Sequence, residues 1–559
     1  KVGSSFARPV SASPVVCCFT WRRRRGAGMY PGSSRVASFG SWRSGGLLNR
    51  HQSLEECLAD EVDVLQVINL VEADGDDTVG EGEGSTGDDS ESLPSVQART
   101  FVFAFFSLGV QMFMSYGGGA VPTSLPKIER ELPRMSNSQV GLLGSLDKIA
   151  LMAISPLVGW AMQRCDQKLL LVFGLALNAF FTFCFGFLQN LYAMLLARFM
   201  QGVSEAQQIV WGSLWTRYMA PPWLLPVWMN LGGVAAGAGN GLGIAVAGYS
   251  DTYPYSFPFT VQAAVLAFLC VIMLFTPGYL LKLPKTDSSD TSADAKSVGM
   301  AGREAVPMRT RDQLRHLLGN RLYLCTMFCI AQNSFMSSGI SFFWTNFFYS
   351  DMWNLDMKAV TTSNLAINAV GLVLGIVLGP ILVNSCGDYT TPEGRYVTLR
   401  LLVKVTAFGA LGATISFFGI LMQALSKDDQ LGIPWLWVVW LGTVPLNFAL
   451  SAQCGVQVVI NIGSVPRNMQ EFALGITTSM QHVIGSAGGV FIPSVVMDIV
   501  WYIWLWFHDF EINDAHLQAI GFMTVMGMSF ILLGTVTLTQ NAAYAKWNKE
   551  HEAVNTWSE

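Results

Sequence analysis

Residues 190–208 read NLYAMLLARFMQGVSEAQQ, and this stretch decides how the whole chain is interpreted. It is apolar enough to lie in a lipid bilayer, yet it carries Arg198 and Glu205, seven residues apart. Seven residues make about two turns of α-helix, so both side chains point to one face, about 10 Å apart along the axis. Charged side chains are costly in a membrane and therefore face a cavity or a partner. The stretch predicts a membrane helix with a polar, functional face.

The composition around this stretch is that of a membrane protein. Of 559 residues, 51% are hydrophobic and 13% are charged, about half the charged share of a soluble domain. About 20 apolar residues span the hydrocarbon as a helix. Twelve stretches of that kind lie near 100–122, 138–162, 168–188, 190–216, 225–250, 258–282, 321–349, 360–385, 398–424, 433–457, 470–503 and 517–540.

Six spans, a polar linker and six further spans are the plan of a transporter with two halves and a site between them. We therefore predict an all-α membrane protein with twelve transmembrane helices in two six-helix halves. Its predicted segments are a basic tail (1–50), an acidic segment (51–98), the N-terminal half (99–283), a cytoplasmic linker (284–320), the C-terminal half (321–541) and a C-terminal tail (542–559).

The two segments before the first span have opposite charge. Residues 1–50 hold nine Lys or Arg and no acid, whereas 51–98 hold fourteen Asp or Glu and no Lys or Arg. The first is expected to be an organelle transit peptide or a disordered basic tail. The second is expected to be disordered, apart from one short amphipathic helix over 54–73. The first residue is Lys1, and the expected reasons are a fragment, a processed chain, or translation from upstream of a start such as Met29.

The basic residues between the spans set the expected orientation. They gather on the side that also holds both termini, and the loop after the first span, with Lys127, Arg130 and Arg134, is the exception. The positive-inside rule places that side in the cytoplasm or its organelle equivalent. We expect a multi-pass protein of a cell or organelle membrane. The basic residues on the side that holds both termini are Arg164, Lys168, Arg217, Lys285, Lys296, Arg303, Arg309, Arg311, Arg315, Arg395, Arg400, Lys546 and Lys549.

The sequence holds no set of groups that points to an enzyme. The ten cysteines form no CxxC motif and no cluster with histidine, and the known nucleophile and phosphate motifs are missing. We predict no enzyme activity, no metal and no cofactor, with proton coupling as an open option. The expected partners are a small-molecule or lipid substrate and membrane lipids, with no nucleic acid. The chain would act as a monomer or as a subunit of a larger membrane assembly.

Ionisable residues inside the spans are the strongest candidates for a site. Arg198 could anchor an anionic head group with its planar fork, and Glu205 could gate transport or carry a proton. The alternative is that both form a structural interhelical pair. Asp147 is expected to face the cavity, and Lys148, about 100° around the helix, to extend toward water instead of facing Asp147. His482 is a proton relay or a packing residue, so Glu205, Asp147 and His482 are the proton-coupling candidates.

Three neutral residues complete the predicted substrate site. Trp211 and Trp344 could line a pocket, and Asn333 could bind substrate. Each could equally serve helix packing, which is the usual role of such residues in membrane bundles.

Four stretches resemble one known family, the major facilitator superfamily, and within it the spinster branch of lipid transporters. YGGGAVPTSLPKIERE (116–131) resembles the spinster pattern YxDRxxxxxVLPxIQ, and SQVGLLGSLDKIALMAISPLVGWAMQRCDQK (138–168) resembles the family's second span. Residues 190–208 are similar to FWxLLxxRxLVGIGEAS, and VPRNMQEFALGITTSMQHVIGSAGG (465–489) to VPxxRRxTAxAxQxxxxHxLGDAGSP. The resemblance covers about 100–540. It implies roles for Arg198 and Glu205 in handling substrate and protons.

The chain departs from the family pattern in its acidic groups. Gly118 and Gly119 stand where the family has Asp-Arg, and Ser486 replaces the Asp of GDA. We hypothesise that Asp147 replaces the lost carboxylate. The leading interpretation is a spinster-like carrier of a lysophospholipid- or sphingolipid-like amphiphile that works by alternating access. The alternatives are a carrier of a polar organic anion or sugar, and a transport-inactive membrane subunit of an organelle complex.

Overall fold

The computed structural model describes residues 95–132, 135–220, 225–250, 252–283, 310–350, 352–353, 355–386, 391–425, 432–466, 469–507 and 514–558. The basic tail, residues 51–94 of the acidic segment and the predicted helix over 54–73 lie outside the described residues. Within the described residues the secondary structure is helical, and it contains no strand.

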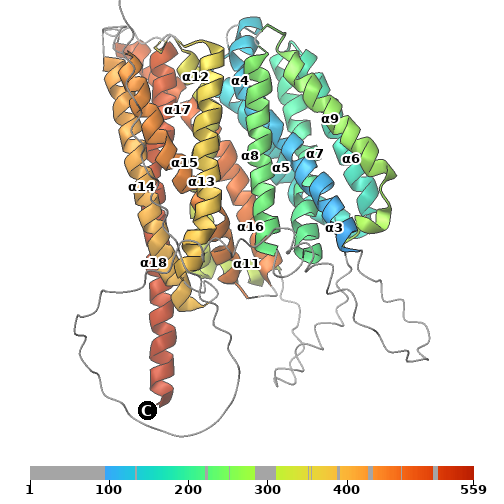
Figure 1. The fold of residues 1–559 in the computed structure, drawn as a ribbon, viewed down its shortest axis with the longest axis vertical. Coiled ribbons are helices and arrows are strands. Elements are labelled where there is room, and N and C mark those ends of the chain that lie inside the picture. Colours follow the sequence, from blue (N-terminus) through green and yellow to red (C-terminus); the bar gives the residue numbers. More distant parts are fainter. Residues whose placement is uncertain are drawn as a thin grey trace, which may run out of the picture. The chain divides into compact units, whose positions relative to one another are not determined.

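The described helices fall into two sets of six spans (Figure 1). In the first set, one span is built from α3 (Val96–Val102), the π-helix η1 (Phe103–Gly109) and α4 (Val110–Glu131). The others are α5 (Asn137–Arg164), α6 (Gln167–Phe187), α7 (Leu191–Met219), α8 (Leu225–Tyr249) and α9 (Ser256–Phe275), followed by the 3₁₀ turn η2 (Gly278–Leu280).

The second set begins with the short helix α11 (Thr310–Gly319), which falls within the predicted linker. Its spans are α12 (Arg321–Tyr349), α13 (Met357–Cys386), α14 (Pro392–Leu425) and α15 (Gly432–Gly463). One further span joins α16 (Gln470–Met480), the π-helix η5 (Gln481–Ala487) and α17 (Gly488–Phe507), and the last is α18 (Asp514–Ser558). The twelve predicted spans are therefore confirmed, and α18 continues as one helix through most of the predicted C-terminal tail.

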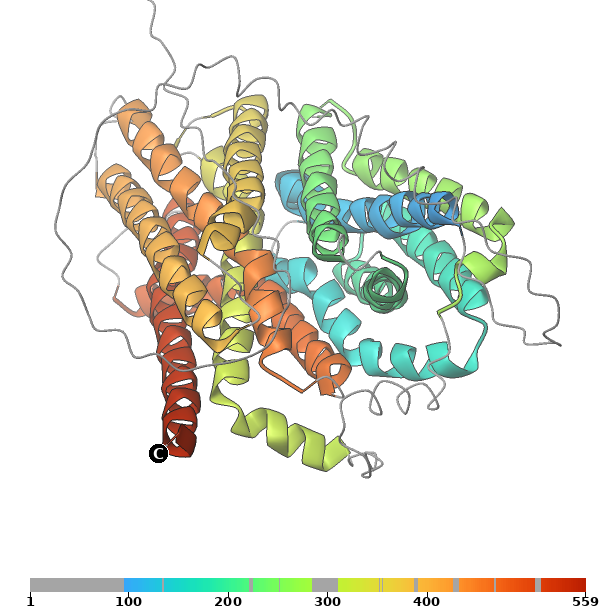
Figure 2. The same ribbon diagram turned by 60° about the horizontal axis from the view of Figure 1, so that its bottom comes forward.

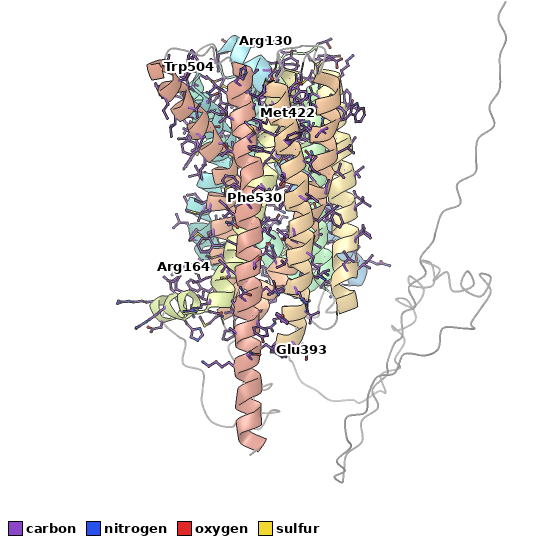
Figure 3. The ribbon with its side chains drawn as sticks, turned by 90° about the vertical axis from the view of Figure 1, so that its left-hand side faces the viewer. Arg130, Arg164, Glu393, Met422, Trp504 and Phe530 are labelled. Carbon is purple, nitrogen blue, oxygen red and sulfur yellow. The ribbon has the colours of Figure 1, made fainter. Side chains whose placement is uncertain are left out.

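Ten of these helices are long and apolar enough to cross a membrane. The other two, α7 and α12, are each 29 residues long but carry more polar side chains. The helix that holds Arg198 and Glu205 is thus one of the two whose composition departs most from a simple membrane span. Large apolar side chains such as Phe530, which is 57% exposed on α18, point outward from the bundle (Figure 3).

The packing of the helices repeats between the two halves. In the first half α4 packs on α8, α5 on α7, and α6 on α9. In the second half the corresponding spans pair in the same way: α12 packs on η5, α13 on α15, and α14 on α18. The chain therefore holds two copies of one six-helix arrangement, as transporters built from internal repeats do. Figure 2 shows the two groups of helices side by side, with α11 beyond the end of α12.

The hydrophobic core shows where the halves are joined. One large cluster combines residues of both halves, including Leu125, Ile128, Trp344 and Phe348. At the end that holds the termini, each half has a core of its own. One lies around Trp211 in the first half, and the other combines residues of α11, α12, α16 and the turn between α15 and α16. The shared core therefore joins the halves at the end away from the termini, which we call the distal end.

Hydrogen bonds reinforce this distal junction. Asp498 of α17 accepts bonds from the backbone N–H groups of Asn137 (3.1 Å) and Ser138 (2.8 Å), at the N-terminus of α5. It also accepts bonds from the side chains of both residues. A carboxylate is well placed at a helix N-terminus, where free N–H groups and the helix dipole favour negative charge. Arg130 donates to the Tyr349 hydroxyl (3.0 Å) nearby, which adds a second link between the halves.

Candidate functional site

The candidate site is built on the crossing of α5 and α7. Asn190 caps α7 by accepting a hydrogen bond from the N–H of Tyr192 (2.9 Å), and Ser136 and Gln139 form a capping box at the start of α5. Gly202 lies where the helices cross: a Cβ atom there would be 2.0 Å from the carbonyl oxygen of Asp147. Small residues allow membrane helices to approach closely. The crossing brings the polar face of α7 against α5.

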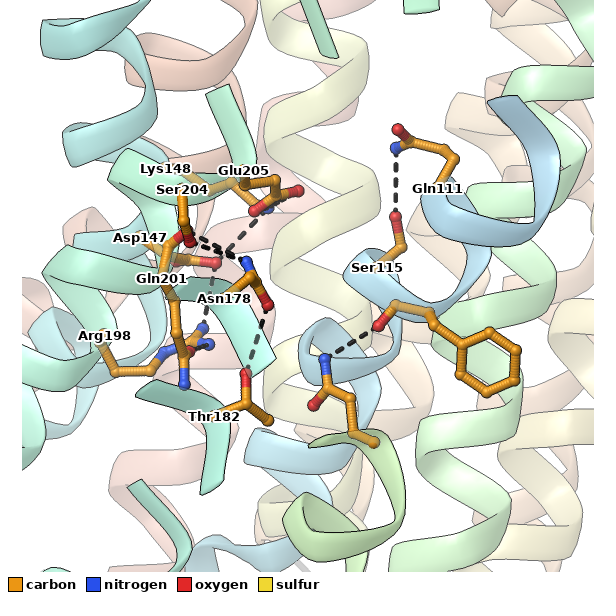
Figure 4. A network of polar contacts seen from close by, with 12 residues as sticks. Gln111, Ser115, Asp147, Lys148, Asn178, Thr182, Arg198, Gln201, Ser204 and Glu205 are labelled. Carbon is orange, nitrogen blue, oxygen red and sulfur yellow. Dashed lines mark hydrogen bonds and ion pairs between the residues drawn. The ribbon is translucent and has the colours of Figure 1, made fainter. Parts of the chain in front are cut away.

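Four charged side chains meet at this crossing (Figure 4). The guanidinium of Arg198 lies 3.1 Å from Asp147 Oδ2. Lys148 Nζ donates to both carboxylate oxygens of Glu205, at 3.1 Å each, and lies 3.4 Å from Asp147 Oδ2. Two acids and two bases thus form one connected network, which we call the charged network.

The network confirms some sequence expectations and corrects others. Arg198 and Glu205 lie on one face and make no direct pair, as predicted, because Asp147 and Lys148 stand between them. The expectation that Lys148 extends toward water, away from Asp147, is wrong. Adjacent residues of a helix point about 100° apart, but this angle describes only the direction of the Cα–Cβ bond. The four-carbon stem of Lys148 is long enough to turn back over the helix surface and reach both carboxylates.

The four charged side chains differ in their exposure and in the hydrogen bonds that they make to other protein groups. The side chain of Lys148 is 22% exposed, against 5% for Arg198 and 6% each for Asp147 and Glu205. Arg198 also donates to the Leu143 carbonyl (3.2 Å) and to Gln201 Oε1 (2.8 Å). Its guanidinium carbon lies 5.9 Å from the centre of the Phe185 ring. Arg198 is therefore held in place by protein groups, and Lys148 is the most accessible cation of the network.

Neutral side chains from α6 support α7 behind the charged network. Gln201 donates to the Phe181 carbonyl (3.2 Å), and Asn178 donates to Ser204 Oγ (3.0 Å) and to the Gln201 carbonyl (3.2 Å). Ordered second-layer bonds of this kind fix the rotamers of the side chains that they touch. Asp147 Oδ1, by contrast, accepts no hydrogen bond from the residues that the structure describes.

His482 comes from the other half. It lies on the π-helix η5, which packs against α5. Its Nδ1 atom has no hydrogen-bond partner among the described residues. Single-turn π-helices are rare and occur frequently at functional sites. Helix α5, which bears two of the four charges, thus packs against the second half.

The first span has no room for a side chain at Gly119, one of the two glycines that stand where the resembled family has Asp-Arg. A Cβ atom on Gly119 would lie 2.0 Å from the carbonyl oxygen of Asn240, so α8 occupies the space that a larger side chain would need. Two residues earlier, a Cβ atom on Gly117 would lie 3.5 Å from an Arg198 nitrogen. Asp147 supplies the carboxylate beside Arg198 from α5 instead. That Asp147 replaces the lost carboxylate in function stays a prediction.

The neutral candidates lie apart from the charged network. Trp211 is fully buried, donates to the Leu281 carbonyl (3.0 Å) and packs on Trp215. Trp344 is buried in the shared core, with its ring 4.6 Å from that of Phe348. Asn333 donates to the Leu450 carbonyl (3.0 Å), which links α12 to α15. Their assignment to substrate binding remains a prediction, and these contacts support a packing role.

Two parts of the site are not predicted by the sequence analysis: the turn of Lys148 toward the two carboxylates and the close approach of α5 at Gly202. The signal for Gly202 lay in the opening stretch itself, because a glycine between Arg198 and Glu205 occupies the same polar face. A small residue on a polar face indicates that another helix crosses there closely. The side chains that pair with Arg198 and Glu205 are then expected on that crossing helix.

Comparisons with known proteins agree with this architecture. Residues 101–490 match the family model described as Major Facilitator Superfamily. A bacterial homolog of the human lysosomal transporter Spinster, solved in an inward-facing, unoccupied conformation, superposes with a TM-score of 0.56. It is 14% identical, and the match covers 81% of this chain and 98% of that chain. No curated protein matches the chain in sequence.

Two further solved structures share the fold with similar scores. A D-xylose–proton symporter has a TM-score of 0.52 at 13% identity, and the match covers 78% of this chain and 97% of that one. The nucleoside transporter NupG has a TM-score of 0.53 at 13% identity, and the match covers 79% and 99% of the two chains. At these identities the likeness concerns the fold alone.

Proposed function

Because this chain belongs to the major facilitator superfamily, we propose that it is a spinster-like carrier of an amphiphile with a charged head group. It would work by alternating access, with the two halves rocking around a site near the middle of the membrane. The charged network carries this proposal. A set of four charges deep in the membrane part is costly to maintain and is usually functional.

The chemistry of the network favours a head group that carries both signs of charge. Lys148 and Glu205 form an ion pair whose cation is the most exposed member of the network. A phosphate could take a place on Lys148 while an ammonium group takes one on Glu205. This exchange of partners leaves the net charge unchanged, so neither protein group becomes an unpaired buried charge. A lysophospholipid or a sphingosine-phosphate type of molecule has such a head group.

The structure also supports one state of the proposed cycle. The halves share a core and hydrogen bonds at the distal end, whereas each has its own core at the end that holds the termini. We propose that the site opens toward the termini in this state, and that this side is cytoplasmic because the loops there are rich in Lys and Arg.

The test is uptake by the purified full chain in liposomes. We expect uptake of lysophosphatidylcholine, and none of a monoacylglycerol with the same tail, because the latter has no charges for Lys148 and Glu205. Glu205→Gln should abolish uptake, whereas Lys358→Met, which removes an exposed lysine of α13, should leave it unchanged. Equal uptake of both lipids would contradict a role of the charged network in recognising substrate.

A second candidate cargo is a small polar molecule such as a sugar. The second half holds a ladder of buried and half-buried amides in which Asn447 donates to Asn368 (2.9 Å), and neutral amides suit hydroxyl groups. The sugar and nucleoside transporters named above share the fold. Uptake of xylose or a nucleoside without uptake of lysolipid would favour this candidate. Failure to move any member of the panel would favour a transport-inactive subunit.

A further inference from the structure

The charged network contains as many positive as negative charges, so its net charge is zero when no substrate is bound. Arg198 and Lys148 carry positive charge, Asp147 and Glu205 carry negative charge, and each charge has an opposite one within 3.4 Å. Lys148 is central because it contacts both carboxylates, and its two bonds to Glu205 are both 3.1 Å long.

An alternating-access carrier must pass through a state in which its site is closed to water on both sides. An unpaired carboxylate in such a site is strongly unfavourable, so a carrier with a lone glutamate needs a proton from solution before it can return empty. Here a lysine of the same half provides the positive charge. We propose that Lys148 is a built-in counter-ion of Glu205, which lets the empty carrier reorient without taking up a proton. Net transport then follows the gradient of the substrate itself. This inference rests on the carrier function proposed above.

The surroundings of Glu205 fit this role. The charged groups that act on it are Lys148 and Asp147 of α5 and Arg198 of its own helix. From the second half, the titratable group on the element packed against α5 is His482 of η5. From α6, Asn178 is neutral and is bonded to Ser204, next to Glu205 in the chain. Lys148 is thus the cation that contacts the Glu205 carboxylate directly, while Arg198 is directed at Asp147.

The first test needs no substrate. Infrared difference spectroscopy of the reconstituted full chain, titrated between about pH 5 and 8, detects protonated carboxyl groups in the range where proton-coupled sites work. A signal is assigned to Glu205 when Glu205→Gln abolishes it. We expect no such signal in the wild type or in the control Lys358→Met. Lys148→Met should gain one, because Glu205 must then take a proton, and Lys148→Met/Glu205→Gln should lose it again. A Glu205-dependent signal in the wild type would overturn the proposal, as would its absence in Lys148→Met.

The second test measures lysophosphatidylcholine uptake with and without a pH gradient of about one unit. Such a gradient changes the protonated fraction of a titrating group up to about tenfold. The wild type should keep its initial rate with and without the gradient. Lys148→Met loses the proposed partner of the phosphate and should be slower, and the uptake that it retains should depend on the gradient by up to that factor. Stimulation of the wild type by the gradient would overturn the inference while leaving the carrier function intact. Absence of lysophosphatidylcholine uptake in the wild type would contradict the proposed lysolipid carrier, and the infrared titration would still decide the role of Lys148.

Discussion

The α5–α7 pair of the first half and the α13–α15 pair of the second half occupy corresponding places in the repeated fold, yet their chemistry differs. Between α5 and α7 lie four charges, joined through Asp147 and Lys148. Between α13 and α15 lie neutral amides: Asn447 donates to Asn368, which donates to Asn364. Both pairs also use glycine for close packing, Gly202 in one and Gly371 in the other.

The difference shows that the fold repeats while the site does not. Helix pairing depends on size and shape, which glycine supplies in both halves. Charge, by contrast, is concentrated in the α5–α7 pair. Its ion-pair network should lose much stability when any one member is removed. The amide ladder between α13 and α15 should lose much less. The predictions below compare the two pairs by removing equivalent parts of each.

The largest effect is expected from Arg198→Leu. The carboxylate of Asp147, which is 4% exposed, then stays buried without its closest cation. Lys148, at 3.4 Å, is its remaining partner. Breaking a buried ion pair from one side costs about 3–5 kcal/mol. We therefore expect a loss of this size in the free energy of unfolding, measured by reversible unfolding in mixed micelles, together with loss of lysolipid uptake.

The double variant Arg198→Leu/Asp147→Leu is the matched control. It removes both members of the pair, so no uncompensated charge remains between α5 and α7, and more than half of the lost stability should return. A double variant as unstable as Arg198→Leu would show that packing of the arginine stem, and not its pairing with Asp147, stabilises the crossing.

An intermediate effect is expected from adding one methyl group to each pair. In Gly202→Ala the new Cβ would be 2.0 Å from a backbone oxygen of α5, whereas in Gly371→Ala it would be 2.6 Å from the Cβ of Asn447. Overpacking costs about 1–3 kcal/mol, and we expect Gly202→Ala at the upper end because a helix backbone yields less than a side chain. Gly527→Ala, with nothing within 4 Å of its Cβ, should be neutral or slightly stabilising. Equal losses for all three would exclude close crossing as the reason for glycine.

Much of this architecture could be predicted from the sequence, because long apolar stretches leave little choice in a membrane. The twelve spans, the two halves and the shared face of Arg198 and Glu205 followed from periodicity and length alone. The partners of these charges did not, because they depend on which helices cross and how a flexible side chain turns. Lys148 shows this limit: its position on α5 was readable, but its contact with Glu205 depends on the closeness of α5 and α7.

The smallest effect is expected in the amide ladder. Asn447→Leu removes the donor to Asn368 and leaves the half-buried amide oxygen of Asn368 without that bond. Interhelical hydrogen bonds in membrane proteins contribute on average about 0.6 kcal/mol, and at most about 2 kcal/mol, because the separated helices also find polar partners. We expect a loss near 1 kcal/mol in the same unfolding assay, and a loss for Asn368→Leu/Asn447→Leu that is smaller than the sum of the single losses. If Asn447→Leu were instead as costly as Arg198→Leu, the two pairs would contribute equally to stability, and the contrast between a charged and a neutral half would not explain how the bundle is held together.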